Sequence, residues 1–261
     1  MKKVYLLLTG VITCVFISNS FAQQIPPEKT KKWHLSTIGL NIGGSSHNYP
    51  NLTYQGLQTL AKDARVDQVD MSGMVRSPYF AAVMSGGVIG GYVGFSKDIS
   101  HKWQAEKRFK ANVYTFGEVV VEYQNLDNNT YESVGWCLMN NRLELEASYL
   151  FRRAGNRSSI TMGPSLGAGT SFNDILIFLG SSDRISNNNG FESGEEFKLR
   201  STKFLTASVD FQYAFRLVDK LALTFDTRFG LGRHLTGERE HDFTSTMFST
   251  SVGFEYQFFR N

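Results

Sequence analysis

The last residues of this chain alternate between two kinds of side chain. From Thr244 to Phe259, apolar or aromatic residues occupy every second position and small or polar residues lie between them. One set is Phe248, Thr250, Val252, Phe254, Tyr256 and Phe258, and the other is Ser249, Ser251, Gly253, Glu255 and Gln257. Because a β-strand points successive side chains to opposite faces, the pattern predicts a strand with one apolar and one polar face. Such a strand at the end of a chain is typical of the closing strand of a transmembrane β-barrel.

Seven upstream segments repeat this alternation. They lie at about 33–45, 79–97, 108–125, 134–152, 158–172, 200–217 and 221–235. The set predicts an all-β fold, an antiparallel up-and-down transmembrane β-barrel of about eight strands. The mean hydropathy of -0.23 agrees with this, because only every second residue of such a barrel faces lipid.

The N-terminus has the pattern of an export signal. A basic start at Met1-Lys2-Lys3 precedes a mostly apolar run from Val4 to Ile17 and the small-x-small site Ser20-Phe21-Ala22. We predict a signal peptide over 1–22, a periplasmic leader over 23–32 and an outer-membrane barrel over 33–261. A retained anchor helix is the alternative, although the apolar run is short for crossing a bilayer. A lipoprotein modified at Cys14 is another, although its neighbours fit that motif poorly.

Composition argues against several classes of function. Removal of the signal peptide lowers the formal net charge from +3 to about +1, which leaves no strongly basic field for nucleic acid. Cys137 is then the remaining cysteine, so an intrachain disulfide is excluded. We find no glycine-rich phosphate loop and no zinc-ligand spacing, and we expect neither a cofactor nor a metal.

The connections between the predicted strands are asymmetric, which suggests their sidedness. Bacterial barrels have short periplasmic turns and longer extracellular loops. We therefore expect the long connections at about 46–77 and 173–199 to be extracellular and to carry any binding. Within the first, Leu52, Leu57, Leu60, Ala61 and Ala64 are spaced for one face of a short helix. Aromatic residues near the turn-side strand ends predict an interfacial girdle of Trp33, Phe109, Phe151, Phe215 and Phe258.

The polar faces of the middle strands collect charge. The predicted lumen residues are Glu118, Arg142, Glu144, Glu146, Asp210, Asp226 and Arg228. The interior of an eight-stranded barrel is only wide enough for its own side chains, so we predict a plug of ion pairs with Arg228 as the main counter-ion. The alternative is a proton or cation path fed by the excess of carboxylates.

Three further hypotheses remain open at this stage. His34 and Ser36 share a strand face, as in the dyad of outer-membrane lipid A deacylases, but no orienting carboxylate can be placed beside them. His234 and His241 lie near Glu238, Glu240 and Asp242, a set that could bind a transition metal. A soluble lipocalin-like barrel or β-sandwich would use the same alternation with its apolar face inward.

The strand pattern, the export signal and the ending Phe254-Glu255-Tyr256-Gln257-Phe258-Phe259 resemble the outer-membrane β-barrel domain family, which includes PorT-like proteins and the small OmpA- or OmpX-type barrels. The resemblance covers nearly the whole mature chain. It implies outer-membrane lipids and the barrel-assembly machinery as partners, and the continuation through Arg260-Asn261 departs from the usual terminal aromatic.

The role that we expect is that of an integral outer-membrane protein with a structural or surface-interaction function, not an enzyme. The alternatives are a narrow channel for small solutes and a rim-located lipid-modifying enzyme. A surface ligand or a secretion-system partner is left open.

Overall fold

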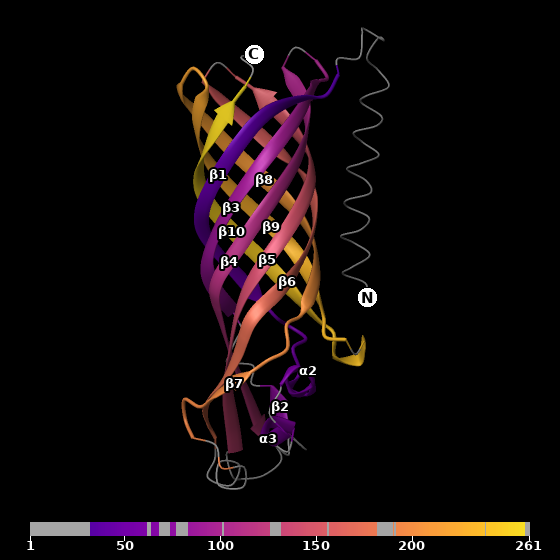
Figure 1. Cartoon of the computed structure of the whole chain (residues 1–261), viewed down its shortest axis with the longest axis vertical. Helices are drawn as coiled ribbons and strands as arrows, with labels where there is room; N and C mark the ends of the chain where they lie inside the picture. The colour runs from indigo at the N-terminus through magenta and orange to yellow at the C-terminus, as the bar shows by residue number, and fades with distance from the viewer. Residues whose placement is uncertain are drawn as a thin grey trace.

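The computed structural model describes residues 32–61, 64–67, 74–76, 83–100, 102–125, 132–155, 157–181, 190, 192–237 and 239–258. The predicted signal peptide and nearly all of the predicted leader lie outside these residues. The described part is a tall cylinder of tilted strands with a smaller lobe at one end (Figure 1). None of its helices is long and apolar enough to cross a membrane.

Eight antiparallel strands form the wall of the cylinder. They are β1 (His34–Asn48), β3 (Val83–Asp98), β4 (Trp103–Asn125), β5 (Glu132–Ala154), β6 (Ser158–Ser181), β8 (Lys203–Val218), β9 (Leu221–Leu235) and β10 (Phe243–Gln257). Each pairs with its neighbour along the chain, and β1 pairs with β10, so the sheet closes on itself. The prediction of an up-and-down barrel of eight strands is confirmed.

The orientation of the two strand faces separates a membrane barrel from a soluble one. In β10, Phe254 is 53% exposed on the outer surface, whereas its neighbour Glu255 is 0% exposed. The same holds across the β1–β10 seam, where Leu40 is exposed and Asn41 is buried. The apolar face therefore points outward and the polar face inward. A soluble barrel requires the opposite arrangement, so that alternative is wrong.

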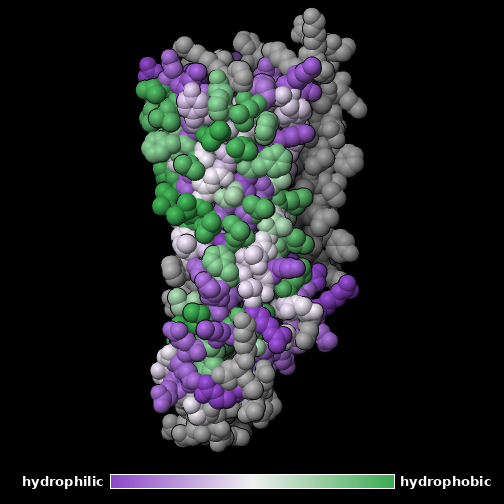
Figure 2. All heavy atoms as spheres, viewed as in Figure 1, coloured by the Kyte–Doolittle hydropathy of each residue, from purple (hydrophilic) through white to green (hydrophobic). Residues whose placement is uncertain are grey.

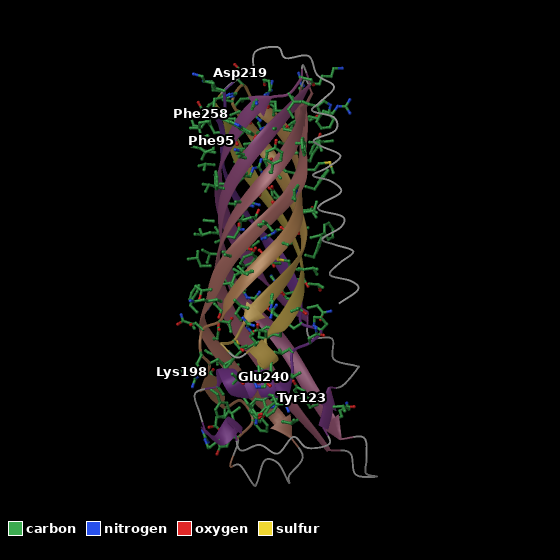
Figure 3. The ribbon with its side chains drawn as sticks, turned by 90° about the vertical axis from the view of Figure 1, so that its right-hand side faces the viewer. Phe95, Tyr123, Lys198, Asp219, Glu240 and Phe258 are labelled. Atoms are coloured by element: carbon green, nitrogen blue, oxygen red, sulfur yellow. The ribbon has the colours of Figure 1, made fainter. Side chains whose placement is uncertain are left out.

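The two ends of the barrel differ. At the turn side, short connections join β3 to β4, β5 to β6 and β8 to β9. At the loop side, β4, β5 and β6 run on past the other strands, with 23, 23 and 24 residues respectively. In Figure 3, Asp219 and Phe258 lie near the turn side, and Lys198, Tyr123 and Glu240 lie toward the loop side.

The extended strands support a folded lobe that we call the cap. Beyond the barrel, β2 (Met74–Arg76) pairs with β4, and β7 (Glu196–Lys198) pairs with β6. The remaining elements on this side are α2 (Tyr54–Leu60), α3 (Ala64–Asp67) and η1 (Arg239–His241). The hydroxyl of Thr53 caps α2 by accepting a hydrogen bond from the amide of Gly56 at 3.2 Å.

A hydrophobic core fills the cap. It is made of Tyr49, Leu52, Tyr54, Leu57, Leu60, Ala61, Val66, Tyr123, Val134, Trp136, Leu138, Leu176, Phe178, Phe197, Leu199 and Phe243. Leu57 and Leu60 belong to the predicted helical spacing, and both are buried in this core. Trp136 lies at its centre with Tyr54, Phe178 and Phe197 around it, at ring distances of 5.2 to 6.0 Å.

Two predicted boundaries are wrong. We placed the end of the fifth strand at 172 and a loop over 173–199, but β6 continues to Ser181 and the loop shrinks. The extra residues stay extended because Leu176 and Phe178 are buried in the cap and pair with β5. The second connection, expected to be about a dozen residues long, is a tight turn in which the amide of Ile99 donates to the carbonyl of Trp103 at 2.9 Å.

Gly39 makes a testable contribution to the packing of the lumen. A Cβ atom at Gly39 would lie 2.2 Å from Cζ of Tyr92, whose hydroxyl is fixed by a 3.0 Å hydrogen bond to Glu255. We expect Gly39→Ala to lower the free energy of unfolding by roughly 1–3 kcal/mol through overpacking. Gly44→Ala is the matched control, since its nearest new neighbour would be 4.0 Å away. Urea unfolding in lipid vesicles measures both, and equal stabilities would contradict this packing.

Candidate functional site

The outer surface of the barrel is an apolar belt. Every strand of the wall contributes exposed apolar side chains from its outward positions, and Figure 2 shows them as a band over the barrel between polar ends. Examples are Leu40, Ile89, Val113, Leu145, Leu166, Leu205, Phe225 and Phe254. Soluble monomers rarely expose one contiguous apolar surface of this kind, so the belt requires an apolar surrounding.

Aromatic side chains occupy the turn-side part of the belt. Trp33, Phe109 and Phe215 are exposed there, and Phe151 and Phe258 are half-buried. Their neighbours are also aromatic, and ring contacts join Trp33 to Tyr149, Tyr149 to Phe151, Phe95 to Phe109 and Tyr256 to Phe258. The structure thus places all five predicted girdle residues on the outer wall, in a wider aromatic set that includes Phe95, Tyr149 and Tyr256.

The lumen is filled with charged and polar side chains in successive layers. Nearest the turn side is a cluster of two acids and two arginines, Glu106, Arg108, Arg152 and Glu255, which we call the turn-side cluster. Arg108 Nη2 lies 2.7 Å from Glu106, and Arg152 Nη2 lies 2.8 Å from Glu255. Each arginine also lies 3.6 Å from the other acid, and Arg108 covers the ring of Tyr92 at 4.2 Å. The four opposite charges balance one another away from water.

Arg228 organises the next layer, the central cluster. Its guanidinium group makes two hydrogen bonds to Glu144, at 2.6 and 2.9 Å, and lies 3.0 Å from Glu146. It also donates to the hydroxyls of Ser208 and Tyr114, each at 2.9 Å. A guanidinium group bound at two nitrogens by one carboxylate is a strong and directional ion pair. Arg228 thus lies between the carboxylates that the sequence assigned to it.

The remaining carboxylates of this layer have their own donors. Asp210 accepts a hydrogen bond from Ser165 at 2.8 Å and lies 3.7 Å from Nε of Arg228. Asp226 accepts one from the side-chain amide of Gln212 at 2.9 Å. Lys110 is buried in the same layer and attracts both acids, and it lines a small polar cavity with Asp226 and Arg228.

Toward the loop side the filling becomes aromatic. Arg142 donates to Nδ1 of His47 at 3.2 Å, and His234 stacks on the ring of Phe243 at 4.6 Å. The guanidinium group of Arg142 also covers the rings of Tyr49 and Phe204, at 5.4 and 5.6 Å. We call this layer the aromatic plug. It is made of His47, Tyr49, Arg142, Phe204, His234 and Phe243. The plug separates the central cluster from the hydrophobic core of the cap.

Several predicted residues lie elsewhere than the sequence suggested. Glu118 belongs to β4, but its side chain lies outside the described set. Arg142 is one layer closer to the loops than the carboxylates bound by Arg228. The hydroxyl of Ser36 donates to the carbonyl of Gly94 at 3.0 Å and accepts from Ser96 at 2.7 Å, so it links two strands of the wall.

The histidine pair considered for a metal is separated by the fold. His234 is inside the barrel and hydrogen-bonds Ser245 at 3.1 Å, whereas His241 belongs to η1 in the last loop. Glu238 is outside the described residues. Among the described residues, no three His, Cys, Asp or Glu side chains gather as metal ligands would.

Sequence reasoning missed four buried charges. Glu106, Arg108 and Lys110 lie near the start of β4, where the predicted strand was drawn too short to include their full alternation. Arg152 was placed on a polar face but not paired. The signal was available, because extending the alternation of β4 back to Trp103 puts these residues on the same face as Asn112.

No family model and no curated protein matches the sequence. Three solved structures are similar in outline. Neisserial surface protein A matches over 87% of this chain and 100% of its own, with 9% identity and a TM-score of 0.34. OprG from Pseudomonas aeruginosa matches over 85% and 96%, with 12% identity and 0.34. Ail, the attachment invasion locus protein of Yersinia pestis, matches over 86% and 100%, with 10% identity and 0.32.

Proposed function

We propose that this chain is an integral outer-membrane barrel that does not conduct and that acts as a structural or surface-interaction protein through its cap. The observation that carries the proposal is the inverted polarity of the barrel. An apolar belt surrounds a lumen that is filled by two ion clusters and an aromatic plug. Membrane lipids match such an exterior, and the polar filling leaves the cap as the accessible surface for a partner.

The absence of conduction follows from the width of the barrel. Eight strands enclose a space that side chains can fill, and the charged side chains in it bind one another. The seal on the loop side is the hydrophobic core of the cap, which draws on segments from both long connections and from the extended strands. A solute would have to displace ion pairs and this core together.

The direct test combines a heat-modifiability gel with conductance. The full mature chain, folded in detergent, should migrate faster unheated than boiled, because a closed barrel resists dodecyl sulfate at room temperature. In planar bilayers the same preparation should give no stepwise current. A folded protein that conducts in reproducible steps would replace the structural role with the narrow channel.

The sidedness of the barrel gives a second expected result. Gly190 lies in the exposed connection between β6 and β7, and Asp219 lies in the exposed turn between β8 and β9. In intact cells, a membrane-impermeant maleimide should label Gly190→Cys and spare Asp219→Cys, while both are labelled after lysis. Cys137 is buried and serves as the internal blank. Labelling of the Asp219 variant alone would reverse the orientation. External protease should likewise cut near Gly190 and spare the turn at Asp219.

A further inference from the structure

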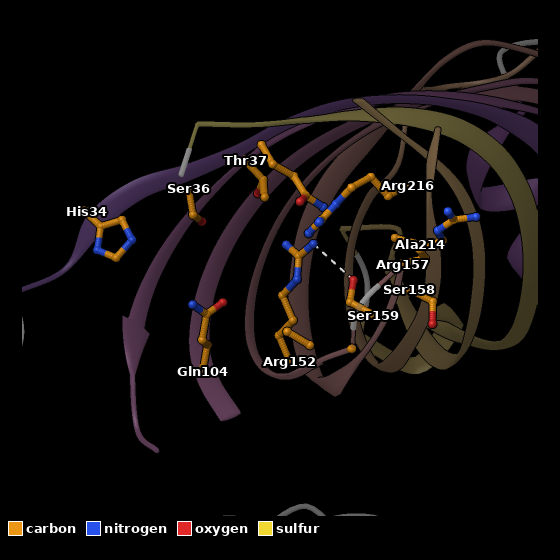
Figure 4. Close-up of a pocket in the computed structure, with 13 residues that line it drawn as sticks. His34, Ser36, Thr37, Gln104, Arg152, Arg157, Ser158, Ser159, Ala214 and Arg216 are labelled. Carbon is orange, nitrogen blue, oxygen red and sulfur yellow. Dashed lines mark hydrogen bonds between the residues drawn. The ribbon is translucent and has the colours of Figure 1, made fainter. Parts of the chain in front are cut away.

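The turn-side mouth of the barrel is a polar pocket that the proposed role does not use. Figure 4 shows side chains from β1, β4, β5, β6 and β8 converging on it. It lies at the opposite end of the lumen from the cap, directly outside the turn-side cluster. None of the residues that line it is acidic, although three of them are arginines, Arg152, Arg157 and Arg216.

The charge of this mouth is positive beyond what the turn-side cluster balances. The charge of Arg152 is matched by Glu255 at 2.8 Å and Glu106 at 3.6 Å, and Arg108 completes a neutral set. Arg157 and Arg216 add positive charge at the opening. In Figure 4 the guanidinium groups of Arg152 and Arg216 extend toward the same region of the mouth. An anion placed there would interact with both.

Hydroxyl and amide groups surround the two guanidinium groups. Ser159 accepts a hydrogen bond from Arg152 at 3.1 Å, and Gln104 and Gln257 line neighbouring sides of the pocket. Thr37 also lines it and is 1% exposed, yet its hydroxyl oxygen has no hydrogen-bond partner among the described residues. Buried hydroxyls normally have a partner, so this one is a donor suited to a ligand.

We propose that the turn-side mouth binds a phosphate group through Arg216, Arg152 and Thr37. Donors approach the pocket from several strands, which suits the tetrahedral oxygens of phosphate better than the two coplanar oxygens of a carboxylate. Arginine forks are the usual partners of phosphate in proteins. The group comes either from a lipid headgroup, since the aromatic girdle lies at this end, or from a free phosphate compound of the periplasm. The site needs only the folded barrel and stands whether or not the lumen conducts.

The test measures binding to the full mature chain folded in an uncharged detergent. The probes are inorganic phosphate and short-chain phosphatidic acid, and the readout is calorimetry at low ionic strength. We expect saturable binding of both, weakened about tenfold or more by Arg216→Gln, as befits loss of one charge-assisted contact. Arg233→Gln, at the loop side and 58% exposed, should leave binding unchanged. Tighter binding of the lipid than of phosphate assigns the headgroup, and equal affinities assign a free phosphate compound.

Thr37 separates ligand binding from a structural role. Because its hydroxyl has no partner inside the protein, Thr37→Val should leave the unfolding midpoint in urea unchanged, and Thr37→Ser should retain binding. We expect the valine variant to bind phosphate several-fold more weakly than the serine variant. Binding that does not saturate, or that is equal in the wild type, Arg216→Gln and Thr37→Val, would overturn the proposal. The gel shift on boiling verifies that each variant is folded.

Discussion

Replacing Arg228 with methionine is expected to lower the free energy of unfolding by about 3–5 kcal/mol, because it leaves two buried carboxylates without their cation. Glu144 loses both hydrogen bonds from the guanidinium group, and Glu146 loses its 3.0 Å contact. Neither group can reach water, since both are buried in the lumen. Methionine restores most of the volume, so the loss reports charge and not a cavity.

Urea unfolding in detergent or vesicles measures this loss, with conductance recorded on the same preparation. Arg233→Met is the matched control, because Arg233 also forms an arginine–aspartate pair but is 58% exposed, and its removal should cost at most about 1 kcal/mol. Arg228→Lys keeps the charge without the fork and should fall between the two. A stable methionine variant with altered ion selectivity would mean that water screens the carboxylates, and it would promote the channel.

The second large effect is expected on the outer surface. Phe225 is 45% exposed in the apolar belt, and its neighbour Asp226 points into the lumen. We expect Phe225→Arg to destabilise the barrel by roughly 2–4 kcal/mol, as a cation near the middle of a bilayer does. The reason is that the guanidinium group would replace an aromatic ring in contact with lipid chains.

Position along the strand supplies the control for this prediction. Val218 is 63% exposed but lies at the end of β8, beside the turn. An arginine there can reach the headgroups, so Val218→Arg should cost only about 0–1 kcal/mol. Reversible folding into vesicles under urea measures both variants. Equal stabilities for the two would contradict a bilayer around the belt.

Much of the barrel could be predicted from the sequence because alternation is a direct record of a strand with two different surroundings. In β10, Phe254 and Tyr256 meet the outside and Glu255 meets the lumen, and no other fold element has this period. The same logic predicted that Arg228 would be the counter-ion of Glu144 and Glu146, since an eight-stranded barrel brings opposite walls within reach of a long side chain.

The prediction failed where the surroundings of a strand change along its length. The loop-side end of β6 has neither lipid nor lumen beside it, and Leu176 and Phe178 enter the core of the cap, so the alternation gave way to a nearly continuous apolar run. The irregularity in β4 between Tyr114 and Gly117 shifts its register against β5. His234 looked like a loop residue, because its stacking on Phe243 depends on the pairing of β9 with β10.

The make-up of the cap core has a consequence for the order of assembly. Tyr49 follows the first strand of the barrel, Trp136 and Phe178 belong to the long middle strands, and Phe243 opens the last strand. Segments from the beginning, the middle and the end of the chain must therefore be present before this core is complete. Since β1 and β10 carry two of them to the same edge, the seam has to close first. The buried state of Trp136 is thus a built-in reporter of barrel closure, and its fluorescence should change after, not before, the membrane-embedded strands have paired.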